Sequence, residues 1–234
     1  MEDRWERTRL LLGEEACNLL MQARVMVVGL GGVGSYAAEG LARAGIGELI
    51  LVDHDRVVMS NINRQLVALT STLGQPKAEV MANRVRDINP DCSVQAYAIR
   101  CNRGTVNDLL NLKPNYVVDA IDSVPDKVCL IKECFFRSIP IISSMGAGNR
   151  IDPTKFTVAD ISQTHTCPLA RRVRQELHRA NIYEGVRVVY SQEKPVSVAA
   201  GSPVGSISFV PSTAGLLLAA TVIKDLLKGI QKAD

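Results

Sequence analysis

The sequence has no C-x-x-C pair, although it contains six cysteines: Cys17, Cys92, Cys101, Cys129, Cys134 and Cys167. Their irregular spacing argues against a four-cysteine zinc site and against a regular disulfide framework. Unpaired thiols of this kind are typical of a reducing compartment. We therefore expect a cytoplasmic protein that binds no structural zinc.

Long hydrophobic runs and aromatic residues are also scarce. The charged N-terminus, MEDRWERTRLLLGEE, lacks the apolar region of a signal peptide, and the longest apolar stretch, 214–223, is too short to span a bilayer. We expect a buried closing helix in that stretch and no membrane insertion. Aromatic residues make up only 4% of the chain, which leaves little for stacking on nucleic-acid bases.

A nucleotide-binding pattern lies between residues 24 and 55. A short apolar strand, 25–28, leads into the turn GLGGVG, which contains Gly29, Gly31, Gly32 and Gly34. Glycines at this spacing let the backbone approach a phosphate at the start of the following helix. A second strand, 48–52, delivers Asp53 where a ribose hydroxyl needs an acceptor. The unit predicts an adenine nucleotide, with NAD as the first interpretation of this unit alone.

Three charged residues further along favour a triphosphate instead. A triphosphate carries about twice the phosphate charge of a dinucleotide, and reaction at its α-phosphate adds charge that must be stabilised. Arg64 and Lys77 can supply the positive charge, and the Asp122 carboxylate can bind Mg²⁺. Because the carboxyl ends of parallel strands meet at one edge of a sheet, we expect Asp53, Asp119 and Asp122 to face the same ligand. Asp119 sits nearer its strand and is expected to be partly structural.

Strands and helices alternate up to residue 148, which predicts a Rossmann-like, three-layer α/β domain with a largely parallel sheet and right-handed crossovers. Two short helices in residues 4–21 precede this part of the chain. The periodicity predicts further strands at 93–99, 115–119 and 139–143, and helices at 76–89, 105–112 and 125–138.

Beyond residue 148 the alternation weakens, and we expect this half to continue the sheet in a mixed or antiparallel fashion. The expected strands are 156–159, 186–191 and 207–210 (ISFV), and the expected helices are 168–180 and 212–228. No repeat or clear linker interrupts the chain. We therefore expect one domain over residues 1–234, with a nucleotide-binding half at 24–148 and a substrate and dimer half at 149–234.

Four ordered motifs carry a family resemblance: GLGGVG, VDHDRVVMSNINRQ, GQPKAE and VVDAIDS. In this order they resemble the ATP-dependent adenylating enzymes of the ubiquitin-activating class, over roughly residues 4–145. The common reaction of that class is attack of a carboxylate on the α-phosphate of ATP, which gives an acyl adenylate and pyrophosphate. Coincidence of four ordered motifs in a plain nucleotide-binding domain is the weaker interpretation.

The resemblance also implies roles for individual residues. Asp53 would hold the ribose, Asn61, Arg64 and Lys77 would handle the phosphates, and Asp122 would act through Mg²⁺. The matching motifs add Asp55, Gln65 and Ser123 to the expected nucleotide site. Arg7 matches an arginine that the family contributes across a homodimer interface. The resemblance further implies a monovalent cation, K⁺ or Na⁺, whose ligands it does not place.

Within that class, AIDSVPDK, GAGNRIDPTK and PLARRVRQEL resemble the branch of tRNA threonylcarbamoyladenosine dehydratases, up to about residue 228. The resemblance implies ATP-driven activation of the threonyl carboxylate on the modified adenosine next to the anticodon of tRNA. The carbamoyl nitrogen or oxygen then closes a ring and expels AMP. A sulfur-acceptor helper protein remains open as a further partner.

Three other functions remain open from the sequence. An activator of a ubiquitin-like sulfur carrier, in the thiamine or molybdopterin pathway, usually has two C-x-x-C pairs, which are missing, and the chain ends soon after its closing helix. An NAD-dependent oxidoreductase would tolerate loss of Lys77. A scaffold would bind ATP without turnover.

The segment PLARRVRQELHRA predicts an amphipathic, basic helix. Leu169, Val173 and Leu177 form its apolar face, and the arginines cover much of the remainder. Such a cluster can neutralise RNA phosphates, although a solvated surface helix is equally consistent with it. Cys167 precedes this helix, where the helix terminus favours a thiolate. Since direct ring closure needs no enzyme thiol, a catalytic Cys167 is the less favoured interpretation.

Overall fold

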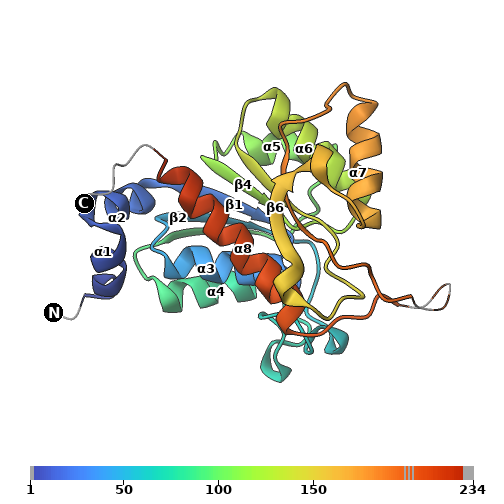
Figure 1. Cartoon of the computed structure of the whole chain (residues 1–234). Coiled ribbons are helices and arrows are strands. Elements are labelled where there is room, and N and C mark those ends of the chain that lie inside the picture. Colours follow the sequence, from blue (N-terminus) through green and yellow to red (C-terminus); the bar gives the residue numbers. More distant parts are fainter. Residues whose placement is uncertain (1–2, 198, 200, 202, 229–234) are drawn as a thin grey trace.

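The computed structural model describes residues 3–197, 199, 201 and 203–228. Seven strands form one sheet in the order β3-β2-β1-β4-β5-β7-β6 (Figure 1). Their bounds are β1 Arg24–Val28, β2 Glu48–Val52, β3 Ser93–Tyr97, β4 Tyr116–Asp119, β5 Ile141–Ser144, β6 Phe156–Asp160 and β7 Arg187–Ser191. Neighbouring strands are parallel except for β6, which pairs antiparallel with β7 at one edge. The expected α/β fold, with a parallel half and a mixed half, is confirmed.

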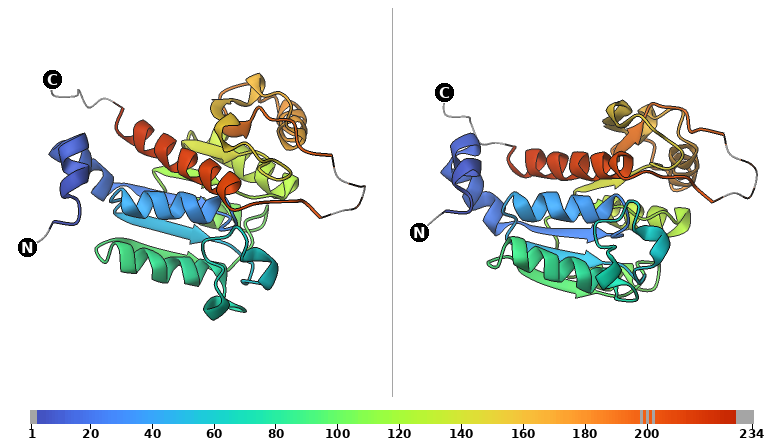
Figure 2. Two further views of the ribbon diagram at one scale, coloured as in Figure 1. Left: turned by 60° about the horizontal axis from the view of Figure 1, so that its bottom comes forward. Right: turned by 90° about the horizontal axis from the view of Figure 1, so that it is seen from below.

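Helices cover both faces of this sheet (Figure 2). One face carries α3, α4 and α8, and the other carries α5, α6 and α7, while α1 and α2 lie at the end of the molecule where β1 begins (Figure 1). The helix bounds are α1 Glu6–Leu12, α2 Glu14–Gln22, α3 Gly34–Arg43, α4 Lys77–Ile88, α5 Val106–Leu110, α6 Val124–Phe136, α7 Pro168–His178 and α8 Phe209–Leu226.

The central strands are apolar on both sides because each side meets a helix layer. In β1, Val25 and Val27 belong to the core beneath α3 and α8, whereas Met26 and Val28 belong to the core beneath α6. All four side chains are buried. This explains why the strand appears in the sequence as a continuous apolar run rather than as an alternating one.

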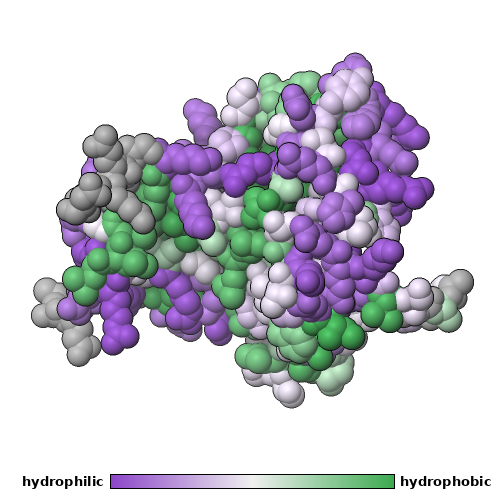
Figure 3. All heavy atoms as spheres, viewed as in Figure 1, coloured by the Kyte–Doolittle hydropathy of each residue, from purple (hydrophilic) through white to green (hydrophobic). Residues whose placement is uncertain are grey.

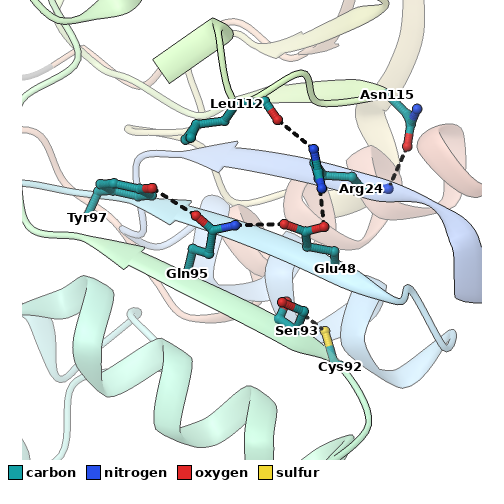
Figure 4. Close-up of polar contacts among 8 residues, drawn as sticks. All are labelled: Arg24, Glu48, Cys92, Ser93, Gln95, Tyr97, Leu112 and Asn115. Carbon is teal, nitrogen blue, oxygen red and sulfur yellow. Dashed lines mark hydrogen bonds and ion pairs between the residues drawn. The ribbon is translucent and has the colours of Figure 1, made fainter. Parts of the chain in front are cut away.

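A chain of polar contacts fixes the register of the first strands at the end opposite to their carboxyl termini (Figure 4). Arg24 Nε donates to Glu48 Oε2 at 2.6 Å, and Gln95 Nε2 donates to Glu48 Oε1 at 2.8 Å. These residues come from β1, β2 and β3 in turn. Asn115 Oδ1 accepts from the Arg24 amide at 2.7 Å, which adds the start of β4 to the same chain of contacts. Because a slip of one residue would break every contact, the polar chain and the apolar faces specify the same register.

The expected strand ISFV at 207–210 is wrong, because the closing helix α8 begins at Phe209 and already includes its last two residues. Apolar residues at alternate positions suggested a strand. In the structure Val210 is fully buried in the first helical turn, while Ile207 and Phe209 remain exposed. Pro211 is compatible with this start, since the first turn of a helix needs no proline N–H.

By length and composition, α8 is the one helix in the described ranges that could cross a membrane. Its apolar residues are used inside the protein, however. Gly40 of α3 is so close to Ala219 that a Cβ at position 40 would lie 2.9 Å from the Ala219 Cβ, and Val210, Ala214 and Leu218 are fully buried. The helix therefore packs as a core helix, as the sequence predicted for residues 214–223.

Candidate active site

A cleft of about 880 Å³ opens at the carboxyl ends of β1, β2, β4 and β5. Its walls come from the glycine turn after β1, the segment after β2, the loop after β4 and the turn 145–150 after β5. The strand order reverses between β1 and β4, and this is the position at which open α/β sheets bind ligands. The fold therefore brings the motifs of the first 150 residues to one place.

The four glycines of the turn divide into two pairs. Gly29 has a positive φ of 88°, and a Cβ there would lie 2.7 Å from the Ala120 carbonyl oxygen. At Gly34 a Cβ would lie 1.7 Å from the Gly29 carbonyl oxygen, so this glycine is required for packing and does not line the cleft. Gly29, Gly31 and Gly32 do line it. At Gly31 and Gly32 the absence of a side chain leaves the backbone free for close approach of a phosphate.

Asp53 holds the glycine turn in place as well as facing the cleft. Its Oδ2 accepts from the Leu30 amide at 2.6 Å, and its Oδ1 accepts from the Asp55 amide at 2.8 Å. The residue is only 8% exposed. The carboxylate predicted to bind a ribose is thus fixed by the two backbone segments that flank the cleft.

Lys77 is a buried cation beside the cleft. It is 4% exposed, and its Nζ donates to Asp55 Oδ2 at 2.8 Å. Partial burial alone would raise the pKa of the Asp55 carboxyl, but the hydrogen bond and charge of Lys77 outweigh that effect and lower it. Because the Asp55 side chain is half-exposed, this ion pair can open when a more highly charged anion approaches Lys77.

The loop between β2 and α4 supplies the remaining phosphate-side residues. Arg64 is half-buried, and its Nη1 donates to the Ser60 carbonyl oxygen at 2.8 Å. It forms no ion pair with a carboxylate within the described ranges. Asn61 is buried and caps the loop, accepting from the Val58 amide at 3.2 Å. Gln65 lies against Gly31, and its buried Oε1 lacks a hydrogen-bond partner in the described part of the chain. An unpaired buried acceptor beside a glycine turn fits a nucleotide that supplies the missing donor.

Asp122 is a better candidate for a metal ligand than the cluster of Asp53, His54 and Asp55. It is exposed, lines the cleft, and makes no side-chain hydrogen bond or ion pair with the residues that the structure describes. Asp53, His54 and Asp55 also cluster closely enough for a metal, but the backbone occupies the Asp53 oxygens and Lys77 pairs with Asp55. A single free carboxylate, completed by phosphates and water, suits Mg²⁺. Ser123, which precedes α6, lines the cleft next to Asp122.

The expectation that Asp119 faces the ligand is wrong. Asp119 and Lys127 are fully buried, and Lys127 Nζ donates to Asp119 Oδ2 at 2.7 Å. The Ser143 hydroxyl donates to the same oxygen at 2.5 Å, and Asp119 Oδ1 accepts from the Ile121 amide at 3.0 Å. Asp119 therefore shapes the loop that carries Asp122 and does not contact the cleft. The burial of Lys127 was not predicted, because a lysine on an amphipathic helix usually points to solvent.

Arg7 lies outside the cleft. It is exposed on α1, at the opposite end of the sheet from the carboxyl termini of the strands (Figure 1). Within one chain it contributes nothing to the site. A role for Arg7 therefore requires a second copy, as the resemblance implies.

The C-terminal half also lines the cleft, and Cys167 and Arg150 are its two residues with reactive or charged side chains there. Cys167 is buried, and its Sγ caps α7 by accepting from the Ala170 amide at 3.5 Å. Arg150, 4% exposed, was missed by the sequence analysis. The signal was the polar turn GAGNR directly after a buried strand, at the same edge of the sheet as the glycine turn.

Some arginines of the basic helix α7 already have partners within the protein. Arg174 is half-buried and donates to the Thr164 carbonyl oxygen at 2.8 Å, and Arg179 pairs with Glu176. Arg171 and Arg172 are exposed and make no ion pair in the ranges that the structure describes. These two remain available to neutralise an anion.

The sheet order and the cleft define a doubly wound, nucleotide-binding α/β protein whose site carries charges suited to a triphosphate. The model of the ThiF family matches residues 5–233, and the chain belongs to this family. The ubiquitin-activating-like resemblance drawn from the four motifs is thereby confirmed.

Two relatives show which members of the family the chain is similar to. The chain is 44% identical to a tRNA threonylcarbamoyladenosine dehydratase of Bacillus subtilis, and the match covers 99% of this chain and 97% of the relative. Crystal structures of the Escherichia coli dehydratase TcdA superpose with TM-scores of 0.90 in complex with ATP and 0.91 in complex with AMP. Their identities are 39% and 38%, with 96% and 97% of this chain and 93% and 96% of theirs covered. Neither of these two relatives is an oxidoreductase.

Proposed function

We propose that the protein is an ATP-dependent dehydratase that cyclises threonylcarbamoyladenosine in tRNA. The observation that carries the proposal is the meeting of Arg64, Lys77 and Asp122 with the glycine turn in one cleft. The whole-length similarity to the Bacillus subtilis dehydratase supports the choice of substrate. The chain is proposed to work as one adenylating domain in the cytoplasm, which its six free cysteines favour.

The first step is adenylation of the threonyl carboxylate. A carboxylate oxygen attacks the α-phosphorus, the bond to the bridging oxygen breaks, and pyrophosphate leaves. Lys77 and Arg64 stabilise the charge that develops on the phosphates. Asp122 would hold a Mg²⁺, which would supply further positive charge for the phosphates. Gly31 and Gly32 allow the backbone amides to approach the phosphates.

The second step closes the ring. The carbamoyl nitrogen or oxygen attacks the activated carbonyl carbon, AMP leaves with the former carboxylate oxygen, and one proton is released. The sum of both steps removes one water from the nucleoside, while ATP becomes AMP and pyrophosphate. Because the nucleophile belongs to the substrate, the step needs no enzyme thiol, and Cys167 acts as a helix cap.

We further propose that the enzyme is a homodimer that shares Arg7 between protomers. Leu10 and Leu11 of α1 are 82% and 81% exposed, and apolar side chains also gather over α8 and over the loop before α4 (Figure 3). An exposed apolar surface of this kind marks an interface. A monovalent cation and a sulfur-acceptor helper protein stay predictions from the resemblance alone.

Pyrophosphate release tests the proposal against its nearest rival. The protein is incubated with ATP and Mg²⁺, and with either threonylcarbamoyl-modified tRNA, the same tRNA without the modification, or a ubiquitin-like sulfur-carrier protein. Release that requires the modified tRNA supports the proposal. Release that requires the carrier protein would replace it with an activator of sulfur carriers.

A further inference from the structure

Arg150 is a buried cation in the half of the cleft that the nucleotide motifs do not form. It follows the turn 145–149 after β5 and is only 4% exposed. Its Nε donates to the Glu193 carbonyl oxygen at 3.3 Å, and its Nη1 donates to the Gly148 carbonyl oxygen at 3.1 Å. Its buried Nη2 lacks a hydrogen-bond partner among the described residues. Only two of its five N–H groups are used, so both N–H groups of Nη2 and one of Nη1 are left over.

No carboxylate pairs with Arg150 within the described ranges. The nearest candidate, Glu193, instead accepts from the amides of Ile151 and Asp152, at 3.2 and 3.0 Å. An arginine keeps its charge at every physiological pH, and a buried charge without a counterion is costly. A site that retains such a residue is suited to an anion that arrives as a ligand.

The position of Arg150 separates it from the triphosphate residues. Arg64 and Lys77 come from the connection after β2, whereas Arg150 follows β5, and the sheet order places β1 and β4 between them. Asp122, in the loop after β4, lines the same cleft. Arg64, Lys77 and the glycine turn are already available to bind the negatively charged phosphates of ATP. The anion for Arg150 is therefore a group that must come close to the α-phosphate from the other side.

We propose that Arg150 binds the carboxylate of the substrate before that carboxylate is adenylated. This inference rests on the proposed function and names the group that the site recognises. A carboxylate has two acceptor oxygens in one plane, which match the free edge of a guanidinium. It is also the charged group that the modification adds to adenosine. Arg150 is thus the residue that selects modified tRNA, while Arg171 and Arg172 of α7 bind its phosphates without selection.

The test measures binding of two forms of one tRNA to the full-length protein without ATP. One transcript carries the threonylcarbamoyl group and the other does not, and fluorescence anisotropy gives both affinities. The wild-type protein should bind the modified form about ten- to hundredfold more tightly, as expected for a charge-assisted hydrogen bond. Arg150→Met should bind both forms equally and retain wild-type affinity for ATP. Arg150→Lys keeps the charge without the planar edge and should recover only part of the preference.

Arg172→Met is the matched control, because it removes an arginine that is exposed on α7. It should weaken binding of both tRNAs by the same factor and keep their ratio. The inference is overturned if Arg150→Met still prefers the modified tRNA, or if the variant loses affinity for ATP instead. It is also overturned if the wild-type protein cyclises modified tRNA but binds both forms equally. If the wild-type protein does not cyclise the modified tRNA when ATP is added, the proposed function itself fails, and the assignment of Arg150 fails with it.

Discussion

At the scale of single residues, Lys77 carries most of the proposed chemistry. Lys77→Ala should lower the rate of pyrophosphate release about hundredfold or more, because it removes a fixed charge that stabilises the reacting phosphates. Its ion-pair partner, Asp55, is half-exposed and can be solvated once Lys77 is gone, so the free energy of unfolding should change little. Steady-state kinetics and chemical denaturation measure the two effects separately.

Lys155→Ala is the control for this prediction. Lys155 is exposed, lies outside the cleft, and makes no ion pair with other described residues. Its replacement should leave both measurements unchanged. A Lys77→Ala enzyme with wild-type turnover would contradict a role for Lys77 at the phosphates. It would favour the alternative in which the site only binds the nucleotide.

For the buried group of Asp119, Lys127 and Ser143 we expect a large change in the free energy of unfolding, in contrast to Lys77. Lys127→Met should lower the free energy of unfolding by about 3–5 kcal/mol, because it leaves the Asp119 carboxylate buried without its cation. Adding Asp119→Asn should restore part of the loss, since an amide can still bond Ser143 and the Ile121 amide without carrying a charge. Equal or greater instability of the double variant, measured by urea denaturation, would show that the ion pair is not the cause.

These residues mark what could be predicted from the sequence. The glycine turn, Asp53 and Lys77 were predicted because each follows a strand or begins a helix, and strand order then brings them together. Asp119 was misplaced because its partner, Lys127, is eight residues away on a helix whose pattern gives no sign of a buried charge. Arg150 was missed because its importance lies in a hydrogen bond that it lacks, which only a structure can show.

At the scale of elements, Glu39 joins α3 to α4. It is 8% exposed, and Arg84 of α4 donates to both of its oxygens, at 2.7 and 3.0 Å. Burial alone would raise the pKa of Glu39, but the hydrogen bonds from Arg84 and Arg43 outweigh burial and hold the pKa below its usual value of 4.5. The contact therefore stabilises the fold above pH 4.5, and the stabilisation is lost as the pH falls through the lowered pKa.

Glu39→Gln should accordingly lower the free energy of unfolding by about 2 kcal/mol at neutral pH. The difference from the wild-type protein should shrink as the pH falls below 4.5. Glu133→Gln, which removes a more exposed helical pair with Arg137, should cost no more than about 0.5 kcal/mol. A Glu39→Gln effect that stays constant down to low pH would mean that the charge of Glu39 is not responsible.

Element boundaries were predicted well where one periodicity dominates and poorly where two compete. Helix α4 begins at Lys77, one residue after the start expected at Pro76. At residues 207–210 alternate apolar residues fitted a strand, yet Val210 and Pro211 are buried in the first turn of α8. Helix α8 packs closely against α3 at two glycines, Gly40 of α3 and Gly215 of α8. Such packing favours a helix here, and it is not visible in a local sequence pattern.

At the scale of the whole molecule, the proposed exchange of Arg7 can be tested by mixing two inactive variants. In a homodimer, Arg7→Ala removes the residue given to the partner, and Lys77→Ala inactivates the receiving site. A heterodimer of the two variants has one intact site, so an equal mixture should regain about a quarter of the wild-type activity. Arg4→Ala in place of Arg7→Ala is the control, and its own activity should be close to wild type. No recovery after subunit exchange would contradict a shared Arg7.

The central claim is that this cleft removes water from a modified nucleoside at the expense of ATP. The most direct measurement incubates the protein with ATP, Mg²⁺ and tRNA from a strain that lacks the enzyme, followed by mass spectrometry of the nucleosides. Threonylcarbamoyladenosine should lose the mass of one water, with one AMP formed for each nucleoside converted. An unchanged nucleoside, with ATP consumed or not, would contradict it.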